Sequence, residues 1–148
     1  MRRLFLMTLV LFAAFLVIQC STVPVTGRRQ LSLVPNSQLL PMSFQQYGQV
    51  LKEGKVSSNA RWTSMVKNAG RKIQGAVERY MAQKNMSSQL NGFAWEFNLL
   101  EEDIVNAWCM PGGKVAFYTG IMPICRDEAG VAVVMGHEVA HALSLIHI

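Results

Sequence analysis

The chain has 148 residues, and 51% of them are hydrophobic, so it can bury the core of one domain of ordinary size. This composition excludes an intrinsically disordered chain and a collagen-like repeat. The formal net charge is +5, but Arg2 and Arg3 lie at the extreme N-terminus and the other basic residues form no cluster. We therefore expect no nucleic-acid partner, because nucleic-acid-binding domains gather their basic residues on one surface.

The first twenty residues have the pattern of an export signal. Arg2 and Arg3 precede an apolar run, residues 4–18, in which Thr8 is the one polar residue. A signal peptide has an apolar region of about 7–15 residues, whereas a helix that spans a bilayer needs about 20. The run matches the signal peptide.

The run ends just before Cys20, and this arrangement resembles the lipoprotein box of bacteria, although the box has a small residue where Gln19 stands. The resemblance implies a signal peptide over residues 1–19, lipidation of Cys20 and a cell-envelope lipoprotein that faces the periplasm and is held to a membrane by its lipid. The alternative is an apolar segment that is not cleaved and serves as an anchor or tether.

The chain contains three cysteines, which is an odd number for an exported protein. If Cys20 carries lipid, Cys109 and Cys125 remain as a candidate disulfide in an oxidising compartment. The alternative is a pair of buried thiols, since the sequence does not give the distance between their Cα atoms.

Residues 20–34 contain turn-forming residues without any period, so we expect a tether there, with the folded domain over residues 35–142. A helix is predicted over residues 43–53, where Phe44, Tyr47 and Leu51 share a face. Asn59 is the expected cap of a second, longer helix. Its apolar residues recur at helical spacing and predict a core-facing stripe: Trp62, Met65, Val66, Ala69, Ile73, Val77, Tyr80 and Met81.

The period changes at Phe93, because Phe93, Trp95 and Phe97 alternate with more polar residues, which is typical of a strand with one buried face. Two further strands are expected over residues 104–110 and 114–119. The turn-forming sequence at residues 111–113 joins them into an antiparallel hairpin.

A loop is expected over residues 120–126, after which Asp127 caps a final helix that begins at Glu128. Helices and a small antiparallel sheet together predict an α+β fold, with the sheet packed on this final helix.

The final helix carries the motif His-Glu-x-x-His as His137, Glu138 and His141. Residues four apart on a helix lie about 40° apart around the axis and about 6 Å apart along it, so both imidazoles reach one point. Two histidine nitrogens so placed are typical ligands of a zinc ion, and Glu138 lies beside that point as a candidate general base. The alternative is a surface helix with two solvated histidines. The apolar neighbours of the motif count against this alternative, because burying these side chains without partners is costly.

Several segments together resemble the zinc metallopeptidase family M48, and in particular its exported bacterial lipoproteins related to a mitochondrial inner-membrane peptidase. The segments are residues 23–31, 106–115, 118–120, 127–130 and 134–142. The resemblance implies a gluzincin fold, zinc as cofactor, and an endopeptidase of the cell envelope that degrades misfolded or unassembled polypeptides. It also implies that Asn106, Ala107 and Trp108 lie beside the metal and bind extended substrate. Pairing with a strand suits a protease of low sequence preference, because backbone groups are common to all substrates.

In that family the third zinc ligand is a Glu from a helix beyond the motif, and no residue of this chain matches it. His147 has the spacing of the third ligand in another class of zinc peptidase, but Ser144 replaces the glycine that reverses the chain there.

The last six residues, 143–148, match the translated end of a transposon used to prepare sequencing libraries. We therefore expect a non-native tail on a truncated chain that is itself inactive. A second class of function is a non-catalytic chaperone or assembly lipoprotein on the same scaffold.

Overall fold

The computed structural model describes residues 20–22, 29–31 and 36–144. The expected signal peptide and most of the tether lie outside these residues. Strand β1 (Cys20–Thr22) pairs antiparallel with β2 (Arg29–Leu31), with Cys20 opposite Leu31. The segment that was expected to be an irregular tether therefore contains a two-stranded sheet.

Helix α2 (Asn36–Glu53) begins earlier than the sequence predicts and contains Pro41. A proline inside a helix removes one backbone hydrogen bond. Pro41 lies in the second turn, so this loss affects only the beginning of the helix. The predicted inner face of the helix is confirmed, since Tyr47 is 1% exposed and Phe44 and Leu51 are partly buried.

Helix α3 (Ala60–Gln83) begins where the sequence predicts. The side chain of Asn59 accepts a hydrogen bond from the backbone N–H of Trp62 at 3.1 Å and caps the helix. Val66, Ala69, Gly70 and Met81 are its buried residues. A short 3-10 helix, η1 (Ser87–Leu90), leads from α3 towards the sheet.

Three strands form the main sheet, in the order β3-β5-β4: β3 (Glu96–Leu100), β4 (Ala107–Met110) and β5 (Lys114–Tyr118). The predicted antiparallel hairpin of β4 and β5 is confirmed, and Gly112 and Gly113 in its turn have φ angles of 85° and 81°. Such angles favour glycine because they bring a side chain too close to the backbone.

The prediction of a wholly antiparallel sheet is wrong, because β3 pairs parallel with β5. The chain leaves β3 and crosses the end of the sheet to reach β4 at the far edge. Strand β5 then lies between β3 and β4 and runs in the same direction as β3. Strand β3 also begins later than predicted, but Phe93, Trp95 and Phe97 still stack in series along one side.

The expected loop after β5 is instead helical, with η2 (Thr119–Ile121) followed by α4 (Met122–Cys125). Helix α5 (Glu128–Ser144) begins where predicted, and its cap is confirmed: the carboxylate of Asp127 accepts a hydrogen bond from the N–H of Gly130 at 2.9 Å.

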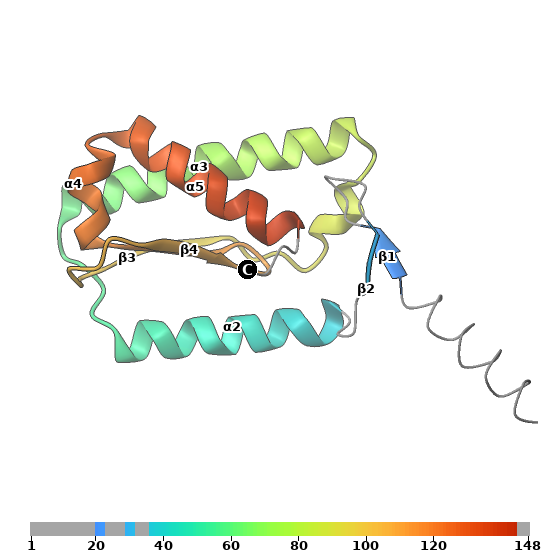
Figure 1. The fold of residues 1–148 in the computed structure, drawn as a ribbon, viewed down its shortest axis with the longest axis horizontal. Helices are drawn as coiled ribbons and strands as arrows, with labels where there is room; N and C mark the ends of the chain where they lie inside the picture. Colours follow the sequence, from blue (N-terminus) through green and yellow to red (C-terminus); the bar gives the residue numbers. More distant parts are fainter. Residues whose placement is uncertain (1–19, 23–28, 32–35, 145–148) are drawn as a thin grey trace, which may run out of the picture.

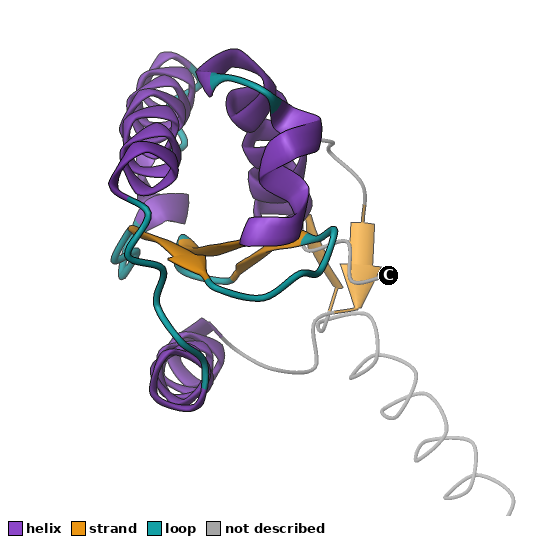
Figure 2. Cartoon of the chain, turned by 90° about the vertical axis from the view of Figure 1, so that its left-hand side faces the viewer, coloured by secondary structure: helices purple, strands orange, loops and turns teal. Residues whose placement is uncertain are grey.

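The sheet lies between two layers of helix (Figure 1). Helices α3 and α5 lie side by side over one face, and α2 lies on the opposite face, as Figure 2 shows end-on. The larger core lies under α3 and α5 and includes Val66, Leu99, Phe117, Val131 and Met135. A smaller core under α2 contains Tyr47, Leu100 and Ala116. None of the described helices has the length and apolar character needed to span a membrane.

An ion pair joins the two upper helices. The ammonium group of Lys72 in α3 lies 2.6 Å from the carboxylate of Glu128 in the first turn of α5, and Asn68 donates a hydrogen bond to the same carboxylate at 3.3 Å. The hydrogen bond from Lys72 holds the pKa of Glu128 below its usual range.

Cys109 and Cys125 are free thiols in the structure, so the disulfide expected from the sequence is not formed there. Cys125 is buried at the end of helix α4, while Cys109 lies on β4 and packs against the larger core. Burial, together with the charge of Glu138, raises the pKa of Cys109 to about 12, and burial raises the pKa of Cys125. Both thiols therefore remain protonated and poorly reactive at neutral pH.

We expect that Gly70→Ala will destabilise the protein by about 1–2 kcal/mol, because a methyl group there would overlap the ring of Phe97. Gly75→Ala in the same helix is the matched control, since the nearest atom is the flexible tip of Arg79 at 3.2 Å. This control should gain up to about 1 kcal/mol from helix propensity. Urea denaturation of both variants measures the difference, and equal stabilities would show that α3 and β3 are not in close contact.

We also expect that a Cys20→Ser variant will carry two thiols that are protected in the folded state and react with maleimide in denaturant without any reductant. Cys125 is buried and Cys109 is partly buried, and their raised pKa values keep the thiolate fraction small. Mass spectrometry of the labelled protein counts the modified cysteines. A chain that accepts label only after reduction would instead contain the disulfide.

Candidate active site

Helix α5 brings His137 and His141 together, as the sequence predicts. Their Nε2 atoms are 2.9 Å apart, and their rings lie at 89° to one another with centroids 4.3 Å apart. The two histidines occupy successive turns of one helix, so the rigid backbone fixes this convergence. The pair offers two nitrogen donors to one point in space.

The histidines are more exposed than the apolar neighbours of the motif suggested. Val131, Met135 and Val139 are buried against the larger core, whereas His137 is exposed and Val133 is 73% exposed. The expectation of burial is therefore wrong for His137, whereas His141 and Glu138 are partly buried, because the apolar residues of α5 lie on two sides of the helix. The convergence of the two nitrogens is the observation that favours a metal.

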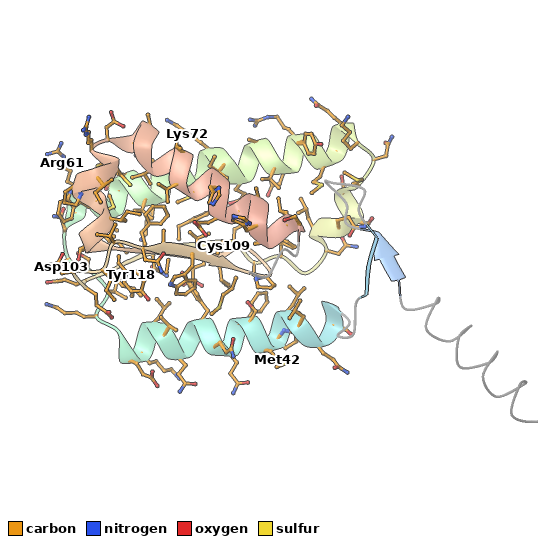
Figure 3. All side chains as sticks on the ribbon, viewed as in Figure 1. Met42, Arg61, Lys72, Asp103, Cys109 and Tyr118 are labelled. Atoms are coloured by element: carbon orange, nitrogen blue, oxygen red, sulfur yellow. The ribbon has the colours of Figure 1, made fainter. Side chains whose placement is uncertain are left out.

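Glu138 lies on the side of α5 that faces the sheet. Helix α5 packs against β4, and Figure 3 shows Cys109 on the sheet beneath α5; after burial, the charge of Glu138 is the second cause that raises the pKa of the Cys109 thiol. Glu138 is partly buried. The site therefore consists of a helix face and the neighbouring strand. The sequence predicts a disulfide or a buried thiol for Cys109, and its alternation with Trp108 along β4 also indicates that it shares a face with Ala107.

Strand β4 forms one edge of the main sheet. Residues of an antiparallel pair alternate between those that bond to the partner strand and those that point away. The carbonyl of Asn106 accepts a hydrogen bond from the N–H of Tyr118, so the backbone of Ala107 and of Cys109 points away from β5. These two residues present the outer edge of the strand beside Glu138.

The structure separates the three residues expected to bind substrate. The side chain of Asn106 accepts a hydrogen bond from the N–H of Ala107 at 2.9 Å, so it lies at this outer edge. Ala107 is 5% exposed and packs in the larger core. Trp108 packs in the smaller core under α2, on the opposite face of the sheet from the histidines. A direct contact between the Trp108 side chain and substrate is therefore not supported, because side chains alternate along a strand.

Within the ranges that the structure describes, no third His, Cys, Asp or Glu joins the two histidines in a metal-binding group. Helix α5 continues without reversal through Ser144, and His147 lies outside the described residues. The two histidines are thus the candidate metal-binding groups among the described residues.

Comparison with known proteins identifies the same region. The sequence model described as "Peptidase family M48" matches residues 67–145, which is just over half of the chain and includes both histidines and Glu138. Mitochondrial metalloendopeptidase OMA1 of Arabidopsis thaliana is 45% identical over 58 residues, which cover 39% of this chain and 12% of that protein. The enzyme of the same name from Saccharomyces cerevisiae is 40% identical over 60 residues, covering 39% of this chain and 17% of its own length.

The metalloendopeptidase OMA1 of Homo sapiens is similar over more of the chain, with 26% identity over 139 residues, which cover 90% of this chain and 25% of the human protein. The chain thus spans a quarter or less of the length of these three relatives.

These relatives correct the location expected from the N-terminus. Each is named as a mitochondrial protein, and they come from a plant, a yeast and a vertebrate. The prediction of an exported lipoprotein in a bacterial cell envelope is therefore wrong by this comparison. An apolar run that follows basic residues does not by itself show to which membrane or compartment a protein is directed.

The residues that the family model matches include helix α5, which carries the motif, and the hairpin formed by the edge strand β4 and its neighbour β5. The chain therefore belongs to peptidase family M48.

Proposed function

We propose that this chain supplies the catalytic helix and the substrate-binding strand of a zinc-dependent endopeptidase. The convergence of the His137 and His141 nitrogens, with Glu138 on the next position of the same helix, is the observation that carries the proposal. Family membership supports it, because the matched region contains all three residues.

The donor set fits zinc. Neutral histidine nitrogens are preferred ligands of Zn²⁺, and a catalytic zinc site uses three protein ligands with a further position for water or substrate. His137 and His141 would hold the ion, and we expect the third ligand from a part of the protein that the structure does not describe. When bound, zinc supplies Lewis acidity, which polarises a carbonyl and lowers the pKa of a coordinated water.

The role proposed for Glu138 is that of general base. Its carboxylate would accept the proton of the attacking water, hold it, and then give it to the nitrogen of the leaving amine. Its position on α5 suits this role, because this helix packs against β4 and a peptide bound along the free edge of that strand would lie near the helix. Partial burial of Glu138 limits the water that competes for this proton.

The edge of β4 suggests how substrate is bound. The outward carbonyl of Ala107 and the outward backbone groups of Cys109 can pair with an extended peptide, which would lie along the free edge of β4, while the N–H of Ala107 bonds to the Asn106 side chain. Such pairing recognises backbone rather than side chains, so the substrates would be unfolded or unassembled polypeptides. Asn106 would add a polar side chain at the same edge.

The test uses the full-length protein. Glu138→Gln should keep its zinc and lose about 10²- to 10⁴-fold in peptide cleavage, because the amide preserves shape but cannot accept the proton. His137→Ala and His141→Ala should lose zinc and cleavage together. Zinc stoichiometry and cleavage of an unfolded protein are measured on the same samples.

Glu128→Gln is the matched control, since it changes a glutamate of the same helix that pairs with Lys72 away from the histidines. It should retain both zinc and activity. Full cleavage by Glu138→Gln would remove this residue from the mechanism. Unchanged zinc content in both histidine variants would favour a non-catalytic scaffold instead.

A further inference from the structure

The smaller core, on the face of the sheet opposite to the histidines, contains a tryptophan from the edge strand. Along β4, Ala107 and Cys109 belong to the larger core beneath α5, whereas Trp108 and Met110 pack in the core under α2. The backbone of Trp108 is directed towards β5, because its neighbours on either side point outwards. Neither its side chain nor its backbone therefore faces the position where a peptide would pair.

The indole of Trp108 is held from two directions. Its Nε1–H donates a hydrogen bond to the hydroxyl of Tyr118 on β5 at 3.2 Å. Its ring meets the ring of Tyr47 from α2 edge-on, with centroids 5.7 Å apart and planes at 84°. An edge-to-face aromatic pair of this kind has a preferred geometry, so it fixes orientation as well as burying area.

Tyr47 is itself tied to the centre of the sheet. It is 1% exposed, its hydroxyl donates a hydrogen bond to the carbonyl of Val115 at 2.7 Å, and the side-chain amide of Asn98 donates to that hydroxyl at 3.1 Å. Burial raises the pKa of Tyr47 above its usual range, so the hydroxyl remains a donor. Helix α2 thus contacts all three strands through one side chain and its neighbours.

A second contact joins α2 to the hairpin. The hydroxyl of Ser43, one turn before Tyr47, donates a hydrogen bond to the carbonyl of Pro111 at 2.7 Å. Phe44 lies so close to Gly112 that a methyl group there would overlap its ring. Strand β4 and the turn after it therefore both pack against α2.

We propose that Trp108 is a positioning residue, which, clamped between Tyr47 and Tyr118, sets the place of the β4 edge relative to Glu138. This inference rests on the proposed function, in which substrate pairs with that edge. An edge strand has a partner on one side only, so its outer position depends on β5 and on the layer beneath it. Trp108 would act on substrate through the outward backbone of Ala107 and Cys109.

The experiment compares four variants of the full-length, zinc-loaded protein: Trp108→Ala, Trp108→Phe, Tyr47→Ala and Leu100→Ala. Leu100 is the matched control, because it is fully buried in the same core but lies on β3, at the other edge of the sheet. Cleavage of two unfolded peptides with different side chains gives KM and kcat, and a melting curve gives Tm for each variant.

We expect Trp108→Ala and Tyr47→Ala to raise KM by about tenfold for both peptides, with kcat changed by less than about threefold, because binding along the strand is lost before the chemical step is affected. Trp108→Phe keeps the ring against Tyr47 and should restore most of the affinity. Leu100→Ala should lower Tm while leaving KM unchanged.

Two results would overturn the proposal. A change in KM confined to one peptide would show that Trp108 touches substrate side chains directly. An equal rise in KM for Leu100→Ala would show that any loss of stability has this effect.

Hydrogen exchange tests the positioning role of Trp108 separately from the endopeptidase function, because the measurement does not require an active enzyme. If the wild-type protein cleaves neither peptide, the endopeptidase proposal fails. The Trp108 and Met110 amides, which bond to β5, should still exchange faster in Tyr47→Ala than in Leu100→Ala. Equal protection of these amides in the two variants would contradict the positioning role as well.

Discussion

The site depends on how helix α5 is rotated about its own axis. Val131, Met135 and Val139 must lie in the core, because they are apolar and recur every fourth residue. Once this face is buried, the directions in which the other side chains of the helix point are fixed. His137 is directed to solvent one turn before His141, and Glu138 is directed towards β4. The hydrophobic effect thus orients the His-Glu-x-x-His motif, although it acts on none of the three motif side chains directly.

The sheet provides the second half of the site and has three short strands. Helices α3 and α5 cover one of its faces and α2 covers the other (Figure 2). Two separate cores result, and β4 contributes to both by alternation. Its small residue Ala107 allows α5 to approach closely, while its large residue Trp108 fills the space under α2. One strand therefore connects the helix that carries the two histidines with the helix on the other side of the sheet.

Local patterns predicted much of the fold correctly. The side chains of Asn59 and Asp127 cap α3 and α5 where the sequence indicates, because a cap satisfies backbone groups within a few residues of itself. The hairpin turn was also predictable, since consecutive glycines at residues 112 and 113 favour its positive φ angles. Pairing between β3 and β5 was not predictable in this way. It joins residues separated by the whole hairpin, and its parallel direction depends on which edge the chain reaches first.

The sequence by itself determined the chemistry of the site: two histidines four residues apart on a helix must converge, and a glutamate between them must lie to one side. Only the tertiary structure decided which side that is, how open the histidines are, and which of the neighbouring residues can meet a substrate. Ala107 and Trp108 are neighbours in the sequence, yet one packs in the core beneath α5 and the other is clamped on the opposite face of the sheet, under α2. The physical reason is that helix periodicity is a local property of the backbone, whereas the two faces of a strand acquire their identity only from the layers packed against them.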